Sequence, residues 1–285
     1  MSDRRKVLPQ YVLPKRGLTA FAGRVASRER GATTTRLVRW FVRKYGVDMG
    51  EAAQPDVTAY ASFNDFFTRA LKEGARPLAA TALVSPVDGT VSQVGDIARD
   101  RIVQAKGHTY STAALVGGDT DLASRFQDGA FATLYLSPRD YHRIHMPCAG
   151  RLVRMVHVPG SLFSVNPVTA RGVPGLFARN ERVVCVFDGV GDAERLGRFV
   201  LVLVGATIVG SMATVWHGVV NGPRVRRVRE WGYADRDLVL QRGEEMGRFL
   251  LGSTVVMLFE PKAGVRFPED WQSGRSIRLG EAMSA

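Results

Sequence analysis

The spacing of hydrophobic residues changes from a helical to a strand pattern along the 285-residue chain. In the first 45 residues the apolar positions recur at i, i+3, i+4 and i+7, which is the spacing of one helix face. Two stripes have this spacing: Leu18, Phe21, Ala22 and Val25, and then Val38, Phe41, Val42 and Tyr45. The pattern predicts two short amphipathic helices. Ser62 could cap a third helix, which would hold Phe63, Phe66 and Phe67.

Beyond about residue 83, short β-branched runs separated by Gly, Pro and Asp replace the helical spacing. No long helical pattern separates these runs, so a parallel βαβ sheet is not expected. The sequence therefore predicts an α+β protein. Its body should be a mainly antiparallel, β-sandwich-like structure, and the amphipathic helices should precede it.

Residues 199–216 form an uncharged run of 18 residues, which meets the lower length limit for a membrane span. Glycine and hydroxyl residues interrupt the run, and its Val and Ile content favours strands. We therefore expect two strands that meet near Gly205, and a chain that lies on a membrane rather than crossing it. No apolar segment follows the first basic residues, so we expect no secretory signal.

Residues 246–260, MGRFLLGSTVVMLFE, are predicted to form one buried strand with an unusual interruption. Gly252, Ser253 and Thr254 separate two apolar runs there. Glycine accepts backbone angles that other residues avoid, and a serine hydroxyl becomes a nucleophile when a base removes its proton. The interruption is therefore a candidate reactive site.

The net charge of +12 is concentrated at the N-terminus. Residues 1–50 contain twelve Lys/Arg and three Asp/Glu, whereas the remaining residues contain 27 and 24. A basic segment can bind nucleic acid, an anionic membrane or an acidic protein. Arginines opposite aromatic apolar stripes favour a membrane surface, with Phe21 and Trp40 as inserting residues. Alternatively, both helices pack on the body and their arginines are merely solvated.

The two cysteines, Cys148 and Cys185, cannot form a disulfide scaffold or a four-thiolate zinc site, and we expect two buried thiols. The densest polar cluster is YLSPRDYHRIHMPCAG, residues 135–150, in which His142 and His145 are three residues apart. That spacing is compatible with a metal ion, with acid–base catalysis or with two loop histidines. No second ligand set at metal spacing accompanies it, so we expect no metal ion.

Asp88 lies in SPVDGTV, just before Gly89 at a predicted turn. Asp88, one of the two histidines and Ser253 supply the residue types of a catalytic triad. However, Ser253 lacks the G-x-S-x-G elbow that a conventional serine hydrolase shows, and it lies within an apolar strand. The carbonyl nearest its hydroxyl is that of Gly252. Attack on the chain itself is thus geometrically easier than attack on an external ester.

Taken together, these segments resemble the phosphatidylserine decarboxylase proenzyme family. The resemblance runs from FNDFFTRAL (63–71) to LGSTVVMLF (251–259). It rests on six blocks in order: SPVDGTV, YLSPRDYHRIHMPCAG, LFSVNP, LFARNER, VLVGATIVGS and MGRFLLGSTV. It implies a basic, membrane-associating helical segment at residues 1–62 and a catalytic β-rich domain at residues 63–285.

The resemblance also implies self-cleavage between Gly252 and Ser253, into a β chain (1–252) and an α chain (253–285). Attack by Ser253 Oγ would convert the amide into an ester. β-Elimination would then leave dehydroalanine, whose hydrolysis expels ammonia and yields an N-terminal pyruvoyl group. Asp88 would orient His145, the base for Ser253, and His142 would assist the later decarboxylation by proton transfer.

The family resemblance further implies that this pyruvoyl group, made from Ser253, serves as the electron sink instead of pyridoxal phosphate. Phosphatidylserine would become phosphatidylethanolamine and CO₂. Phe163, Ser164 and Asn166 are our candidates for head-group binding. Expected partners are the substrate, an anionic phospholipid membrane and a second cleaved unit in a dimer, with no nucleic acid. The expected location is the cytoplasmic side of the inner cell membrane, as a peripheral protein.

Two alternatives stay open. A serine hydrolase that uses Asp88, His145 and Ser253 on an external ester would keep an intact chain and react with fluorophosphonates. A basic module that binds lipid or nucleic acid would keep its function after Ser253→Ala.

Overall fold

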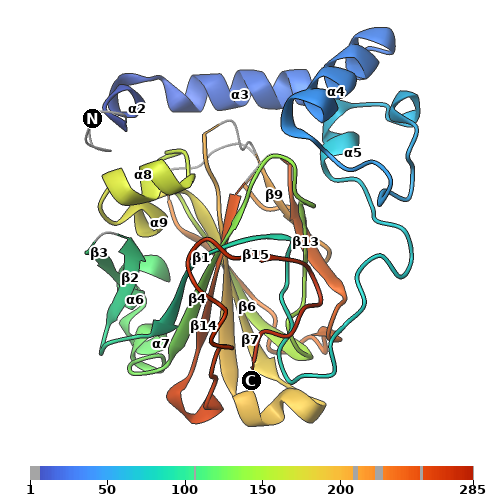
Figure 1. The fold of residues 1–285 in the computed structure, drawn as a ribbon. Helices are drawn as coiled ribbons and strands as arrows, with labels where there is room; N and C mark the ends of the chain where they lie inside the picture. The colour runs from blue at the N-terminus through green and yellow to red at the C-terminus, as the bar shows by residue number, and fades with distance from the viewer. Residues whose placement is uncertain (1–6, 106, 208–210, 222–226, 251–252, 285) are drawn as a thin grey trace.

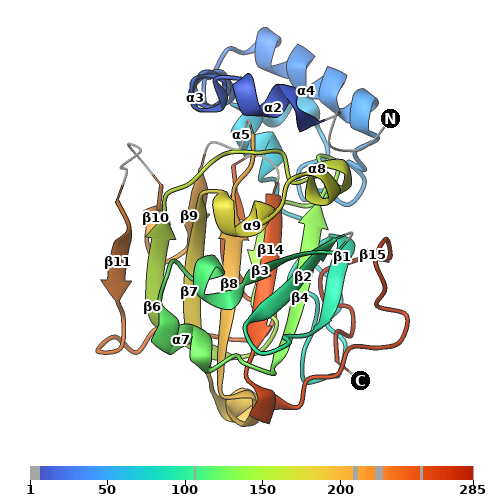
Figure 2. The same ribbon diagram turned by 90° about the vertical axis from the view of Figure 1, so that its left-hand side faces the viewer.

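Two amphipathic helices lie across one end of a β-rich body (Figures 1 and 2). The computed structural model describes residues 7–105, 107–207, 211–221, 227–250 and 253–284, and only the backbone of residues 16 and 253. The helical segment contains α2 (Pro9–Val12), α3 (Lys15–Ala26), α4 (Ala32–Tyr45), the 3₁₀ turn η1 (Val57–Ala59) and α5 (Phe63–Phe67). Both helices predicted from the apolar stripes are therefore present, as α3 and α4.

A nine-stranded sheet forms the centre of the body, and the pairings between its strands are all antiparallel. Its order is β11-β6-β7-β8-β14-β4-β1-β15, with β12 also paired to β6. The strands are β1 (Gly89–Asp96), β4 (Ala130–Leu136), β6 (Gly150–Val158), β7 (Arg182–Gly189), β8 (Arg198–Val204), β11 (Arg229–Gly232), β12 (Val239–Leu240), β14 (Ser253–Phe259) and β15 (Ser276–Ile277).

A four-stranded antiparallel sheet of order β10-β9-β13-β5 and a separate hairpin accompany the large sheet. The small sheet contains β5 (Arg143–His145), β9 (Met212–Thr214), β10 (Gly218–Val219) and β13 (Glu245–Phe249). The hairpin pairs β2 (Arg101–Ala105) with β3 (His108–Ser111). Short helices complete the body: α6 (Thr112–Leu115), α7 (Thr120–Ser124), α8 (Pro167–Gly172), α9 (Leu176–Arg179), η2 (Gly191–Leu196) and η3 (Pro261–Ala263).

The central strands are apolar throughout because both faces of the large sheet are covered. Along β14, Val255, Met257 and Phe259 face one core, which also contains Met212, Met246 and Phe249 of the small sheet. Val256 and Leu258 face a second core, beneath α6–α9. Side chains alternate between the faces of a strand, so one run fills both cores. The predicted α+β fold with an antiparallel, sandwich-like body is confirmed.

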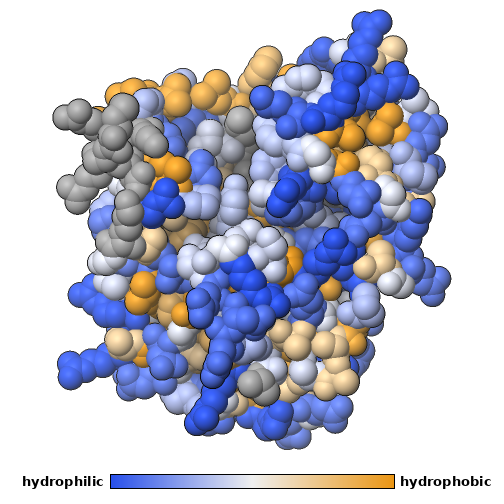
Figure 3. Space-filling model, in the orientation of Figure 1, coloured by the Kyte–Doolittle hydropathy of each residue, from blue (hydrophilic) through white to orange (hydrophobic). Residues whose placement is uncertain are grey.

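The helical segment has its own small core, which includes Phe41 of α4 and Phe63, Phe66 and Phe67 of α5. Ser62 and Asp65 form a reciprocal capping box at the start of α5, as the sequence predicted. Because Phe41 is only 8% exposed, it belongs to this core. By contrast, Phe21 is 66% and Trp40 50% exposed. Figure 3 shows apolar atoms gathered along the outer edge of the helical end.

The run at 199–216 provides two strands, as predicted: β8 ends at Val204 and β9 begins at Met212. Within the described part of the chain, no helix has the length and hydropathy to cross a bilayer. The single strand predicted at 246–260 is wrong, because β13 belongs to the small sheet and β14 to the large one. Ser253 and Thr254 are thus the first two residues of β14, in the large sheet.

Candidate active site

The N-terminal end of β14 is the point at which the candidate segments meet. Ser253 pairs with Leu136 of β4, and Thr254 pairs with Val204 of β8. On the other side of β4, Thr90 pairs with Tyr135, which places Gly89 opposite Leu136. Residues 253 and 89 therefore flank Leu136 from two strands, about 10 Å apart. Gly252 lies outside the described residues.

Gly89 allows the Asp88 turn to approach β4 this closely. A Cβ atom at position 89 would lie 2.4 Å from the carbonyl oxygen of Tyr135, a distance that no real Cβ contact has. The backbone N–H of His145 donates to Pro86 at 2.9 Å, so β5 also runs beside this turn. The sequence SPVDG thus brings Asp88 next to the strand that carries His145.

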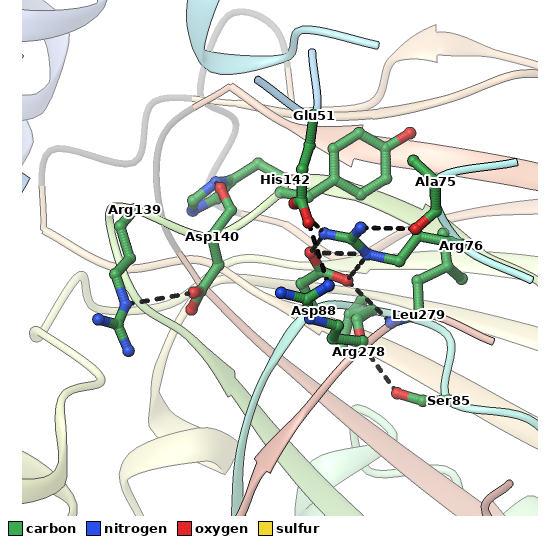
Figure 4. Close-up of polar contacts among 12 residues, drawn as sticks. Glu51, Ala75, Arg76, Ser85, Asp88, Arg139, Asp140, His142, Arg278 and Leu279 are labelled. Carbon is green, nitrogen blue, oxygen red and sulfur yellow. Dashed lines mark hydrogen bonds and ion pairs between the residues drawn. The ribbon is translucent and has the colours of Figure 1, made fainter. Parts of the chain in front are cut away.

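Asp88 is buried and held by a network of charged hydrogen bonds (Figure 4). Arg76 donates to its two carboxylate oxygens at 2.9 Å from Nε and 2.6 Å from Nη2, and the backbone N–H of Leu279 donates at 2.8 Å. Arg76 also binds Glu51 at 2.6 Å. These contacts hold the Asp88 carboxylate in one position.

His145 is held by its own neighbours, and no hydrogen bond joins it to Asp88 among the described residues. Its Nδ1 lies 2.7 Å from the carbonyl oxygen of Gly243, which can only accept, so Nδ1 carries the proton. Its Nε2 then accepts from the hydroxyl of Tyr141 at 3.1 Å. Burial lowers the pKa of His145; the hydrogen bond to Gly243, the charge of Glu245 and, least of these, the charge of Asp88 oppose that shift.

His142 is fully buried, and one ring nitrogen is left without a partner. Its Nδ1 donates to the carbonyl of Asp140 at 2.7 Å, and its ring packs on Phe67 with centroids 3.9 Å apart. Its Nε2 makes no hydrogen bond within the described residues. Desolvation lowers the pKa of His142 to about 3, so the ring stays neutral with a basic lone pair on Nε2. The carbonyl of His142 accepts from Phe249 at the end of β13.

A polar cleft of about 300 Å³ opens beside these residues. Its lining includes Arg69, Asp88, Arg139, Asp140 and Tyr141. Burial raises the pKa of Tyr141 to about 12 and raises that of Asp140. No group of three or more His, Cys, Asp or Glu side chains in the described ranges could hold a metal ion. The cleft therefore offers guanidinium, carboxylate and phenol groups to a ligand.

The loop candidates Phe163, Ser164 and Asn166 lie apart from the residues that line this cleft. Phe163 is buried, and its backbone N–H donates to the Asn180 side chain. The Ser164 backbone N–H donates to Gln10 at 2.9 Å, and the Asn166 side chain caps α8. Their described contacts attach this loop to α2 and to the body.

Sequence reasoning missed Tyr141, Asp140 and Arg69 as site residues. Tyr141 and Asp140 were inside the quoted histidine cluster, and Arg69 was inside FNDFFTRAL, but no periodicity separated them from ordinary polar residues. The LFARNER block is explained by burial, because Asn180 donates to the carbonyls of Phe163 and Gly205 at 2.8 Å each. That block fixes loops rather than lining the cleft.

Comparisons with known proteins show the family of the chain. A family model described as phosphatidylserine decarboxylase matches residues 63–285, and a second, described as PSD, matches residues 5–46. The chain belongs to the phosphatidylserine decarboxylase family. It is thus related to decarboxylases and not to serine hydrolases, the main alternative in the sequence analysis.

Relatives within the phosphatidylserine decarboxylase family match the chain over its full length. A phosphatidylserine decarboxylase proenzyme from Methylibium petroleiphilum is 72% identical over 284 residues, covering 100% of this chain and 98% of the relative. Proenzymes of the same name from Variovorax paradoxus and Acidovorax ebreus are 70% and 68% identical, with the same coverage. The matched sequence therefore includes the N-terminal segment, which forms α3 and α4 in this chain.

Proposed function

We propose that this chain decarboxylates phosphatidylserine to phosphatidylethanolamine, after it cleaves itself between Gly252 and Ser253. The observation that supports this most strongly is the register of β14, which begins at Ser253 beside Leu136 and opposite the Asp88 turn. A serine at the first position of a central strand has its own preceding peptide bond as the nearest acyl group. The relatives named above are called proenzymes, which agrees with processing of the chain.

Cleavage needs a neutral base for the Ser253 hydroxyl, and burial keeps the nearby imidazoles neutral. We assign this step to His145. Its Nε2 lone pair accepts from Tyr141 in the uncleaved arrangement and would exchange that partner for Ser253. The carbonyl of Gly243 fixes the required tautomer, and Asp88 stabilises the imidazolium through space. In this proposal Asp88 acts on His145 by its charge and not by a direct hydrogen bond.

The bond changes balance without an external oxidant. Ser253 Oγ adds to the Gly252 carbonyl, and the C–N bond breaks to give an ester. Loss of the Ser253 α-proton expels the Gly252 carboxylate and leaves dehydroalanine. Water then replaces nitrogen, which leaves as ammonia, and residue 253 becomes a pyruvoyl group. That group supplies a ketone electron sink for decarboxylation.

His142 is the residue we assign to proton transfer in the decarboxylation step. Its Nε2 is buried and makes no hydrogen bond within the described residues, and a neutral imidazole there can hold a hydrogen bond or receive a proton. Its ring orientation is set by the Asp140 carbonyl and by packing on Phe67. Both contacts are built by the described chain, so the ring is positioned before substrate arrives.

The helical segment is the proposed membrane-binding surface, on the cytoplasmic side of the inner membrane. Leu18 is 42% exposed, and Phe21 and Trp40 are exposed to a still greater extent. Exposed arginines of α3, of α4 and of the link between them lie on the same segment: Arg24, Arg28, Arg36, Arg39 and Arg43. Each basic residue near an anionic leaflet contributes about 1 kcal/mol to binding. Apolar insertion and charge thus act together.

A direct assay tests the proposed function. Purified protein is incubated with vesicles that contain phosphatidylserine labelled at the serine carboxyl carbon, and released CO₂ and phosphatidylethanolamine are measured. The parent should form both in equal amounts, and Ser253→Ala should form neither. Equal turnover by Ser253→Ala would exclude a group made from that serine.

A further inference from the structure

Arg69 is a buried guanidinium that lacks a carboxylate partner. It follows α5, is 5% exposed and lines the polar cleft. Within the described residues, no carboxylate lies at ion-pair distance. Its Nη2 donates to the carbonyl of Arg139 at 3.3 Å, and its Nε makes no hydrogen bond. An arginine carries five N–H donors, so most of the hydrogen-bonding capacity of Arg69 is unused.

Three other arginines with little exposure are compensated. Arg76 binds both Asp88 and Glu51, and Arg143 binds Glu245 at 2.8 Å. Arg182 is 3% exposed and donates to the carbonyls of Leu115, Asn180 and Ala114 through three different nitrogens. The guanidinium carbon of Arg69 lies 5.5 Å from the centroid of the Phe66 ring, and the carboxylates of Asp88 and Asp140 act on it only through space. Burying a cation without a direct ionic partner is costly, so Arg69 in the cleft wall indicates an anionic ligand.

The position of Arg69 identifies which anionic group it meets. Phe41 of α4 packs on Phe66 and Phe67 of α5, with ring centroids 5.8 and 6.0 Å apart, and His142 packs on the other side of Phe67. Arg69, which lies just after α5, is thus beside a stack of rings that runs from α4 to His142, the residue to which we assign proton transfer in the decarboxylation. In a phospholipid, the phosphodiester lies between the glycerol and the serine. Arg69 therefore has the same place in the structure, between the helical segment and His142, as the phosphodiester has in the lipid, between the glycerol and the serine.

We propose that Arg69 binds the phosphodiester of the substrate head group, an inference that rests on the function proposed above. The serine carboxylate is the other anion of the substrate, but it leaves as CO₂. A strong ion pair with it would stabilise the ground state more than the transition state and slow the reaction. The phosphodiester is unchanged by the reaction, so the same contact can hold substrate without opposing chemistry.

The test uses Arg69→Gln and Arg69→Lys in the full chain, after mass spectrometry has shown that each variant is cleaved like the parent. For Arg69→Gln we expect the KM for phosphatidylserine to rise about tenfold or more, with kcat within about threefold of the parent. Lysine keeps the charge but not the planar fork, so its KM should rise less. Arg125→Gln is the control for lost charge, because Arg125 binds Glu260 beyond the opposite end of β14.

Two soluble probes separate the anionic groups. Glycerophosphoethanolamine carries the phosphodiester without the carboxylate, and L-serine carries the carboxylate without the phosphodiester. The inhibition constant of glycerophosphoethanolamine should rise about tenfold in Arg69→Gln, while that of L-serine stays unchanged. The reverse pattern, or a KM within about twofold of the parent, overturns the proposal.

Failure of the proposed function is distinguishable from failure of this inference. Calorimetric binding of glycerophosphoethanolamine to the Ser253→Ala chain needs neither cleavage nor turnover, and Arg69→Gln in that background should weaken it by the same factor. If Arg69→Gln does not fold, Arg69→Lys takes its place, with an expected rise in dissociation constant of about threefold. An unchanged dissociation constant refutes the role of Arg69 even in an active enzyme.

Discussion

The buried histidine His142 should make the stability of the protein fall steeply in mild acid. The ring is fully buried and neutral, and its pKa is lowered from 6.5 to about 3. As pH falls below about 6.5, the unfolded chain binds a proton at this ring and the folded chain does not. The free energy of unfolding therefore decreases through this window, and the decrease ends near pH 3.

The size of the effect follows from the two pKa values. At pH 7 the folded ring is unprotonated and the unfolded ring is about 24% protonated, whereas at pH 5 the unfolded ring is about 97% protonated. The loss between these pH values is about 2 kcal/mol. A folded pKa one unit higher leaves this figure almost unchanged, because the folded ring still carries little charge at pH 5.

Urea unfolding at pH 7 and pH 5 measures this loss. The Ser253→Ala background keeps the chain in one piece, so unfolding does not separate two chains. His142→Asn is the matched control, because an asparagine amide can still donate to the Asp140 carbonyl but does not titrate. The parent background should lose about 2 kcal/mol more than the control between the two pH values. Equal losses would show that His142 titrates normally and that its site is hydrated.

Two further predictions concern the histidines and the helical surface. His145→Ala should stay uncleaved, whereas His142→Ala should be cleaved yet form no phosphatidylethanolamine. Mass spectrometry measures the cleavage, and lipid analysis measures the product. Cleavage of His145→Ala but not of His142→Ala would show that the two histidines have the opposite roles. Phe21→Ser with Trp40→Ser should lower the fraction bound to anionic vesicles without changing the melting temperature. By contrast, Phe41→Ser should lower the free energy of unfolding by about 3 kcal/mol, because the Phe41 ring is buried. If Phe41→Ser instead lowered the fraction of protein bound to vesicles and left the stability unchanged, Phe41 would belong to the membrane-binding surface.

The helices and strands were predicted well from the sequence wherever the spacing of apolar residues reflects which side chains are buried. The stripe through Phe41 became α4, and the β-branched runs became strands, because their spacing is determined by which faces are covered. The sequence did not predict that Phe41 packs inward while Phe21 stays exposed, since both have the same helical spacing. Partners distant in sequence, here the phenylalanines of α5, decide that difference.

The strand interpretation of 246–260 failed for a related reason. Apolar content fixes a buried strand but not the sheet that it joins, and β13 pairs with β5 and β9 whereas β14 pairs with β4 and β8. In the site, motifs identified Asp88, His142 and His145. The Gly243 carbonyl and the Arg76 network come from segments far along the chain and carry no local signal.

The central claim is that the chain makes its own electrophile from Ser253, and intact mass tests it most directly. The purified, denatured parent is measured beside a Ser253→Ala control. The parent should give two chains, 1–252 and 253–285, with the smaller lighter by one ammonia than a serine-headed peptide. The control should give one chain of 285 residues. An uncut parent that nevertheless decarboxylates phosphatidylserine would contradict the account.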